Sequence, residues 1–251
     1  MPGGTRCLSV VIPSYNEEAT IAHVVQKVLL LDVVMEVIVI NDCSTDRTSE
    51  IIRELALSDP RVRVLQHDVN RGKTAALKTG FAEVRGEIVI VQDADLEYDP
   101  TEIPDVIQPI INGQADVVFG SRFLVRKASR VLYFYHYLAN KALTFTSNLF
   151  TNINLTDVET GYKAFRSEII RQMKITSSGY GFEIEVTAKV AKLGCAIYEV
   201  PISYYGRTYE QGKKIGPMDG AAAFCYVLRY NVFCDLRSSF VKIPVLPAKT
   251  L

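Results

Sequence analysis

Cysteine is scarce in this sequence, and its five copies show no paired spacing. An odd number of scattered cysteines, at positions 7, 43, 195, 225 and 234, argues against a disulfide framework and against a Cys-rich metal site. The chain also lacks any run of about 18 uncharged apolar residues, and it does not begin with the apolar core of a signal peptide. We therefore expect a protein of the reducing cytoplasm that neither is secreted by a cleaved signal nor spans a membrane.

Net charge is absent as well, since 28 basic residues balance 28 acidic ones. Such a chain has no overall field that would attract nucleic acid, so we expect no nucleic-acid partner. With 251 residues, of which 48% are hydrophobic and 22% charged, the chain is long enough to bury a full core. We expect residues 1–251 to form a single domain.

Short apolar, β-branched runs alternate with segments of helical periodicity, which is typical of βαβ units. The pattern predicts an α/β fold with a mostly parallel central sheet flanked by helices. Strands are expected at residues 8–12, 34–40, 62–66, 88–91 and 116–120, and further strands at 160–165 and 196–204. Helices are expected over 21–29, from about 45–48 to 56, over 73–83, over 167–173, over 182–193 and over 220–233. A further helix is expected to open at Pro100 and Thr101 and to lead to the strand at 116–120.

Two segments allow more than one structure. Asn16 or Thr20 is a candidate cap for the first helix, and Ser44 or Thr45 for the second. Residues 130–152 are helix-like and rich in aromatic side chains, which fits either a buried helical hairpin or a surface that meets a lipid chain.

A carboxylate cluster follows the apolar run at 88–91. Asp93, Asp95 and Glu97 come directly after this predicted central strand, and ligands of parallel sheets bind beyond the carboxyl ends of the strands. Hard oxygen ligands suit Mg²⁺ or Mn²⁺, which would hold a diphosphate there. The alternative is an acidic turn exposed to solvent.

The other predicted strands also end in polar residues. Tyr15 and Glu17 follow the first strand, Asp42 the second and Lys73 the third, and each is suited either to contact a nucleotide or to a turn. Arg122 follows the fifth strand, while Arg207 and Lys213 or Lys214 lie in a glycine-punctuated loop. These last groups are candidate cations for the charge on a departing phosphate, or solvated loop charges.

Glycine is missing from residues 13–18, the first predicted strand-to-helix turn. A dinucleotide-binding fingerprint needs several glycines at that turn for close backbone approach. This absence argues against a Rossmann-type oxidoreductase.

Seven segments together resemble family 2 glycosyltransferases, and in particular the polyprenyl-phosphate branch that includes dolichol-phosphate mannose synthases. They cover nearly the whole chain from residue 8 to about 216. The segments are VVIPSYNEEATI (10–21), VIVINDCSTDRT (37–48), NRGKTAALKTGF (70–81), VQDADLEYDP (91–100), GSRF (120–123), DVETGYKAF (157–165) and EVPISYYGRTYEQGKKIG (199–216).

The resemblance implies an A-type glycosyltransferase fold and one inverting transfer from a UDP- or GDP-hexose to a polyprenyl phosphate. It divides the chain into a nucleotide-sugar half (about 1–125), an acceptor half (about 126–216) and a C-terminal helical tail (about 217–251), with helices lining the acceptor side. It implies that Asp95 and Glu97 bind the metal, and that Asp95, Arg122, Asp157 and Arg207 are catalytic. The implied donor contacts are Pro13, Tyr15, Glu17, Asp42, Lys73, Asp93, Ala94, Asp95, Arg122, Arg207 and Lys214.

The acceptor side departs from the family pattern. One alignment puts His136 and Asn140 where mannose synthases carry an arginine and a serine, and it leaves Arg130 as the nearest basic residue. Asp157 would be a general base for a hydroxyl acceptor, but a phosphate acceptor is already an anion and needs none. Two alternatives to this function stay open: transfer to a hydroxyl acceptor, and a nucleotide-sugar binding module without catalysis. We also expect that the protein can contact the cytoplasmic face of a membrane peripherally and can form a homo-oligomer.

Overall fold

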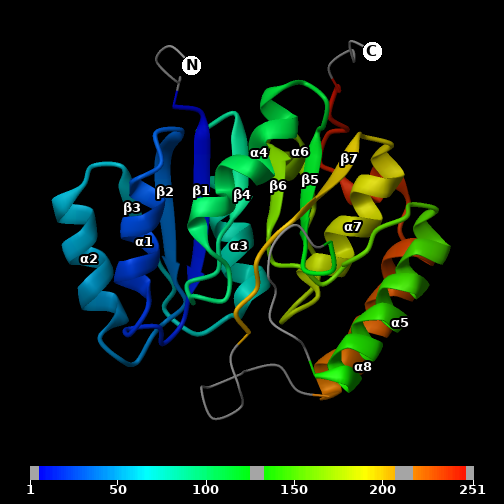
Figure 1. Ribbon diagram of the computed structural model, residues 1–251, viewed down its shortest axis with the longest axis horizontal. Coiled ribbons are helices and arrows are strands. Elements are labelled where there is room, and N and C mark those ends of the chain that lie inside the picture. The colour runs from blue at the N-terminus through cyan, green and yellow to red at the C-terminus, as the bar shows by residue number, and fades with distance from the viewer. Residues whose placement is uncertain (1–5, 125–132, 207–216, 247–251) are drawn as a thin grey trace.

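A mixed sheet of seven strands forms the centre of the protein, in the order β3-β2-β1-β4-β6-β5-β7 (Figure 1). The computed structural model describes residues 6–124, 133–206 and 217–246. The strands are β1 Leu8–Ser14, β2 Val34–Asn41, β3 Val62–Gln66, β4 Ile88–Val91, β5 Val117–Ser121, β6 Lys163–Arg166 and β7 Ile197–Pro201. Every residue of β4 is buried, as expected for a strand covered on both faces. The predicted α/β architecture is confirmed.

Helices cover both faces of the sheet. Helices α1, α2 and α4 pack on one face around Val10, Val25 and Val106, whereas α3, α6 and α7 pack on the other around Leu77, Phe165 and Val186. The helices are α1 Ile21–Leu29, α2 Thr48–Ser58, α3 Lys73–Ala82, the short 3-10 helix η1 Pro100–Glu102, α4 Ile103–Ile111, α5 Phe134–Thr151, α6 Ser167–Gln172, α7 Phe182–Leu193, α8 Pro217–Val232 and α9 Leu236–Ser239.

Strand β6 runs opposite to its neighbours. It pairs antiparallel with both β4 and β5, while the other pairs in the sheet are parallel. The beginning of β6 therefore lies at the same edge of the sheet as the ends of the parallel strands. Residues 155–162, which precede β6, reach the edge where the carboxylates of the first half gather.

Helices α5 and α8 pack against each other and against α7 at one end of the molecule (Figure 1). Within the described part of the 130–152 segment the chain forms one helix, so the first of the two expected structures, a buried helical hairpin, is wrong. Leu143, Thr144 and Ser147 face inward, but a stripe of apolar side chains on α5 faces outward. We call this the α5 stripe, and its members are Phe134, Leu138, Phe145 and Leu149.

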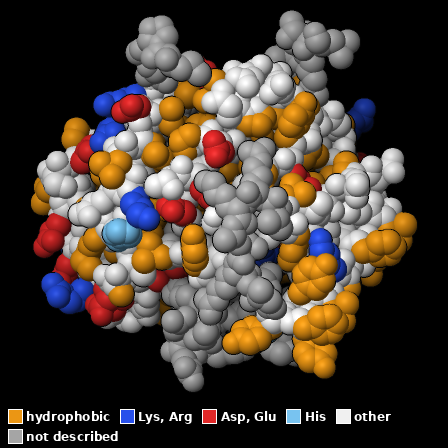
Figure 2. Space-filling model, viewed as in Figure 1, with side chains coloured by type: hydrophobic (Ala, Val, Ile, Leu, Met, Phe, Trp, Pro, Cys, Tyr) orange, Lys and Arg blue, Asp and Glu red, His pale blue; other side chains and the backbone are white. Residues whose placement is uncertain are grey.

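The α5 stripe belongs to a larger apolar area. Phe224, Leu228 and Val232 are exposed at four-residue spacing on α8, and Figure 2 shows hydrophobic side chains gathered over both helices at the lower right. In the described ranges, no helix combines the length and the apolar character needed to cross a bilayer.

Helix capping differs from the prediction. Thr20 stands at the N-cap position of α1 and Arg47 at that of α2, but neither donates or accepts a side-chain cap hydrogen bond. The Asn16 side chain instead accepts from the Thr45 amide at 2.8 Å, which ties the turn after β1 to the turn after β2. The polar residues predicted as caps thus connect two loops at the carboxyl edge of the sheet.

Candidate functional site

An ion pair between Arg122 and Asp157 lies at the carboxyl edge of the sheet. Arg122 follows β5, and its Nε and Nη2 atoms donate to the two Asp157 oxygens at 2.6 and 2.7 Å. The Arg122 backbone amide donates to the same carboxylate at 3.1 Å. Because β5 pairs with the reversed β6, these residues meet although 35 positions separate them. The pair has the bidentate geometry that only arginine provides.

Burial makes this ion pair interdependent. Asp157 is fully buried, which alone would raise its pKa, but the charge and hydrogen bonds of Arg122 lower the pKa of Asp157 below its usual value. Burial would likewise lower the pKa of Arg122, and Asp157 raises it well above its usual value. Asp157 is therefore ionised, weakly basic and occupied on both oxygens. The guanidinium also lies 5.0 Å from the centre of the Tyr204 ring.

Lys73 connects the start of α3 to two other elements. Its Nζ atom lies 2.9 Å from Asp93 after β4 and 3.2 Å from Glu183 in the first turn of α7. Burial alone would lower the pKa of Lys73, but these two carboxylates raise it well above its usual value. Gly161 allows the backbone to approach Asp93 closely, since a Cβ atom at position 161 would stand 2.6 Å from Asp93 Oδ2.

The predicted metal ligands lie on one turn. The Glu97 amide donates to Asp95 Oδ1 at 3.1 Å, and the Tyr204 hydroxyl donates to Glu97 Oε2 at 2.9 Å. Both carboxylates are partly exposed. The part of the chain that the structure describes holds no group of three or more His, Cys, Asp and Glu side chains placed for a metal. Two carboxylates completed by diphosphate oxygens and water nevertheless fit Mg²⁺ or Mn²⁺.

Predicted donor contacts in the first half lie near the same edge. Tyr15 is 36% exposed and offers a ring face, whereas Glu17 is buried and accepts from the Thr20 hydroxyl at 3.1 Å. Pro13 is partly buried near the end of β1, and Ala94 is buried beside the carboxylates. These placements are compatible with nucleotide contacts, which stay predictions.

Asp42 has a structural role that its sequence position did not reveal. It is 3% exposed, and it accepts hydrogen bonds from His67 Nδ1 at 2.6 Å and from the amides of Arg71 and Gly72 at 2.9 and 2.7 Å. His67 in turn contacts the Thr79 hydroxyl at 2.9 Å. Asp42 therefore holds the turn that leads to Lys73. The sequence offered no signal for His67 beyond its place directly after a strand.

The predicted acceptor residues lie at the start of α5. His136 is exposed and packs 6.0 Å from the Tyr133 ring, and Asn140 accepts from the Thr144 hydroxyl at 3.2 Å. Arg130 lies outside the described residues, as do Arg207, Lys213 and Lys214. The structure therefore leaves the predicted roles of these four cations untested.

Lys141 is a cation near the site that the sequence interpretation missed. Its Nζ atom lies 4.2 Å from the centre of the Phe123 ring and donates to the Thr156 carbonyl at 3.0 Å. Phe123 follows Arg122 directly, and its ring meets the Tyr137 ring edge-on at 5.4 Å. The sequence did contain a signal for Lys141, because it is the one lysine or arginine between residues 134 and 151 and therefore stands out in an otherwise apolar and polar segment.

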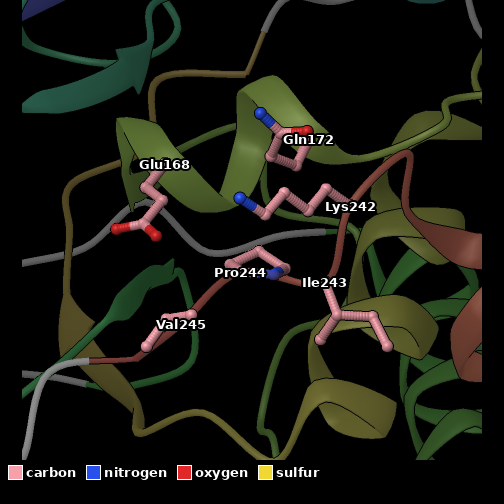
Figure 3. A pocket seen from close by; sticks show the side chains of 6 residues that line it. All are labelled: Glu168, Gln172, Lys242, Ile243, Pro244 and Val245. Carbon is pink, nitrogen blue, oxygen red and sulfur yellow. The ribbon is translucent and has the colours of Figure 1, made fainter.

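A small pocket between α6 and the C-terminal segment lies at the other edge of the sheet (Figure 3). Its lining residues are Glu168, Gln172, Lys242, Ile243, Pro244 and Val245. Helix α6 follows β6, whose reversed direction places it away from the ends of the parallel strands. This pocket is separate from the carboxylates and cations described above.

Comparison with known proteins finds one family over most of the chain. The family model "Glycosyl transferase family 2" matches residues 9–174. The undecaprenyl-phosphate mannosyltransferase of Micrococcus luteus is 32% identical over 224 residues, which are 84% of this chain and 89% of that protein. The polyprenol monophosphomannose synthase of Mycolicibacterium smegmatis is 30% identical over 214 residues, which are 82% of this chain and 80% of that protein.

A solved structure has the same fold. The glucosyl-3-phosphoglycerate synthase of Mycobacterium tuberculosis, in complex with Mn²⁺, UDP and phosphoglyceric acid, superposes with a TM-score of 0.70 at 26% identity. The match covers 94% of this chain and 85% of that one. The predicted A-type glycosyltransferase fold is thus confirmed.

Proposed function

Because this chain belongs to glycosyl transferase family 2, we propose that it transfers a hexose from a UDP- or GDP-sugar to a polyprenyl phosphate in one inverting step. The names of the two relatives reported above support a polyprenyl-phosphate acceptor, since one is an undecaprenyl-phosphate mannosyltransferase and the other a polyprenol monophosphomannose synthase. The neighbour with UDP and Mn²⁺ supports a metal-dependent nucleotide-sugar donor. The observation that carries the proposal is the buried Arg122–Asp157 pair at the edge that also holds Asp93 and Asp95.

Each residue has a role in this reaction. Asp95 and Glu97 would hold Mg²⁺ or Mn²⁺, which when bound neutralises the diphosphate so that it becomes a better leaving group. Arg122 donates to phosphate oxygens as negative charge develops, and Asp157 is a positioning residue that fixes the guanidinium. Tyr15, Glu17, Asp42 and Lys73 belong to the donor side, and Arg207 and Lys214 are proposed from the sequence alone.

A hydroxyl acceptor is the second candidate, and the phosphoglyceric acid in the neighbouring structure is the observation behind it. Such an acceptor needs a base, and Asp157 is poorly suited because Arg122 occupies both of its oxygens and lowers its pKa. A polyprenyl phosphate is already ionised, so orientation and charge neutralisation suffice. Asp157 as a positioning residue therefore supports the phosphate acceptor.

Donor and acceptor can be tested separately with the purified chain. With Mn²⁺ present, one nucleotide sugar among UDP-glucose, GDP-mannose and UDP-N-acetylglucosamine should raise Tm, because a ligand at 100 times its Kd stabilises the folded state by about 2.7 kcal/mol. In detergent, that sugar should then be transferred to polyprenyl phosphate and not to the matching polyprenol. No Tm shift with any nucleotide sugar, or transfer to the alcohol instead, contradicts the proposal.

We also propose that the α5 stripe contacts the cytoplasmic face of a membrane. Helix α5 contains aromatic and aliphatic side chains and no Asp or Glu, which suits the interface of a bilayer. Through Lys141, Phe123 and Tyr137 it adjoins Arg122, where a lipid phosphate would have to arrive. The five cysteines form no disulfide among the described residues, which supports a reducing compartment.

Vesicle binding tests this contact. Replacing Phe145 and Leu149, which are 70% and 71% exposed, by serine should lower partitioning onto phosphatidylcholine–phosphatidylglycerol vesicles at least about tenfold, because apolar burial at the interface is lost. Cosedimentation measures the effect. The control is Leu30→Ser with Leu57→Ser, which removes side chains 81% and 90% exposed on α1's C-terminal flank and on α2. Equal binding by both double variants would contradict the proposal.

A further inference from the structure

A carboxylate on β7 holds the turn that carries Asp157. Glu199 is in register with Phe119 of β5, on the strand that leads to Arg122. Because β5 lies between β6 and β7 (Figure 1), the Glu199 side chain reaches past β5 to the turn before β6. The two Glu199 oxygens accept from the Thr156 amide at 2.9 and 3.0 Å, and Oε1 also accepts from the Asp157 amide at 3.3 Å. Glu199 therefore orients the backbone from which the Asp157 carboxylate projects.

Thr156 connects this carboxylate to the other half of the ion pair. Its hydroxyl donates to Glu199 Oε1 at 3.2 Å and lies 2.6 Å from the hydroxyl of Ser121, the buried residue directly before Arg122. From the opposite side, Lys141 of α5 donates to the Thr156 carbonyl at 3.0 Å. The backbones of both members of the ion pair are thus tied to one carboxylate on a third strand.

Fold stability alone does not explain an ionised carboxylate at this position. Burial raises the pKa of Glu199, and the hydrogen bonds from Thr156 and Asp157 offset this effect only in part. A carboxyl group whose pKa is raised by folding is less favourable in its ionised form inside the protein than in the unfolded chain. Ionisable groups held at such a cost are typical of positions that serve a site.

The orientation of Asp157 matters because Arg122 depends on it. The guanidinium is bound at two nitrogens, 2.6 and 2.7 Å from the two oxygens of one carboxylate, so a shift of the 155–157 turn moves the guanidinium with it. A displacement of about 1 Å in a group that stabilises a transition state lowers the rate by about a hundredfold. The hydrogen bonds of Glu199 restrain the turn against such a displacement.

We propose that Glu199 is a positioning residue for the transfer reaction, because it holds the turn from which Asp157 orients Arg122 toward the diphosphate. This inference rests on the proposed function, since it assumes that Arg122 donates to the phosphates of a nucleotide sugar. Glu199 acts only through the ion pair. Its loss therefore lowers kcat, because Arg122 acts as negative charge develops, and changes the KM values for donor and acceptor little.

Steady-state kinetics of the intact chain with Mn²⁺ and polyprenyl phosphate in detergent tests this proposal. Glu199→Ala should lower kcat at least about tenfold and change both KM values less than about threefold. Glu199→Gln keeps the length of the side chain and an oxygen that accepts from the Thr156 amide, so its kcat should stay within about threefold of the wild type. Glu199→Asp keeps the charge but withdraws both oxygens by one methylene group. Its kcat should therefore fall further than that of Glu199→Gln, and this comparison holds even if the alanine variant does not fold.

A double-mutant cycle shows whether Glu199 acts through Asp157. Asp157→Asn retains a single acceptor oxygen and cannot bind Arg122 at both nitrogens, so its kcat should fall but stay measurable. Adding Glu199→Ala to this variant should lower kcat by less than about threefold more, because the positioned side chain is already impaired.

Asp116→Ala is the control for a loss of stability alone. The Asp116 carboxylate accepts from the Ala196 amide at 2.8 Å, at the opposite end of the same two strands, β5 and β7. This variant should lower Tm and leave kcat at the wild-type value when the assay temperature is well below Tm.

The outcomes separate this inference from the proposed function. A wild-type kcat in Glu199→Ala, a lower kcat in Glu199→Gln than in Glu199→Asp, or a loss as large in the Asp157→Asn background as in the wild type overturns the inference. So does a loss of kcat in Asp116→Ala equal to that in Glu199→Ala. In all these cases the wild-type chain still transfers hexose, and the proposed function stands. A wild-type chain that transfers no hexose from any nucleotide sugar would contradict the proposed function and this inference with it.

Discussion

Replacing Arg122 by alanine is expected to abolish transfer and to lower the free energy of unfolding by about 3–5 kcal/mol. The side chain is 13% exposed and its partner Asp157 is completely buried, so the variant leaves an uncompensated carboxylate in the interior. Urea denaturation measures the stability, and initial transfer rates with polyprenyl phosphate measure the activity. Arg122→Lys should recover part of the stability and little of the activity, because lysine cannot form two parallel hydrogen bonds.

A double substitution distinguishes the two effects of the pair. Arg122→Met combined with Asp157→Leu removes both charges, and it should restore most of the stability because apolar side chains commonly replace a buried ion pair without loss. The same protein should stay inactive, since no guanidinium remains for the phosphates. If Arg122→Ala were as stable as the wild type, or if the double variant were active, the pair would not have the role we assign.

The lowered pKa of Asp157 also sets a pH dependence with a definite sign. A carboxyl group whose pKa is lower in the folded protein stabilises the fold above its unfolded pKa of about 3.9, and this stabilisation is lost as the pH falls further. The difference in unfolding free energy between wild type and the double variant should therefore be constant from pH 6 to 8. It should shift in favour of the double variant on acidification below about pH 4.

Replacing Asp95 by alanine should reduce metal-dependent transfer at least about a hundredfold, since a catalytic metal supplies several kcal/mol of charge stabilisation. Folding should be nearly unaffected, because the Asp95 side chain is partly exposed in a turn after β4 and not in the core. The measurements are initial rates over a Mn²⁺ titration and the Tm with and without Mn²⁺ plus nucleotide sugar. The combined ligands should raise the Tm of the wild type and leave that of the variant almost unchanged.

Asp105→Ala is the matched control for this experiment. Asp105 is an exposed carboxylate on α4, so its removal changes the net charge equally without touching the strand end. The control should keep the rate and the ligand-induced Tm shift of the wild type. Full activity of Asp95→Ala in Mn²⁺ would show that the metal, if one acts, is held elsewhere.

Two strands and one inner helix were predictable to the residue. The predicted bounds 62–66 and 88–91 coincide with β3 and β4, and 182–193 coincides with α7. These segments are apolar on the faces that they bury, and clear turn residues flank them, so local pattern and tertiary packing agree. Asp93, Asp95 and Arg122 were found for a related reason, because polar residues directly after such strands must lie at one edge.

Features that depend on tertiary contacts could not be predicted. The sequence of Lys163–Arg166 contains nothing that marks β6 as antiparallel to its neighbours. Without that information, the contact between Arg122 and Asp157 could not be predicted. The role of Asp42 was hidden because its partners, His67 and the amides of the 71–72 turn, come from another loop. Side-chain hydrogen bonds between distant loops produce no periodic pattern in a sequence, so they cannot be predicted from it.

The pairing of β5 with β6 brings the two ends of the segment that carries α5 together at neighbouring strands. The chain leaves the sheet after Ser121, forms α5, and returns to the adjacent strand at Lys163. The segment between Ser121 and Lys163 therefore starts and ends at two neighbouring strands. Its length and composition can change between relatives while the sheet and its first four strands keep their structure. Grafting only α5 from a relative with a different acceptor leaves Arg122 and Asp157 in place, and is therefore a direct test of whether this helix sets the acceptor specificity.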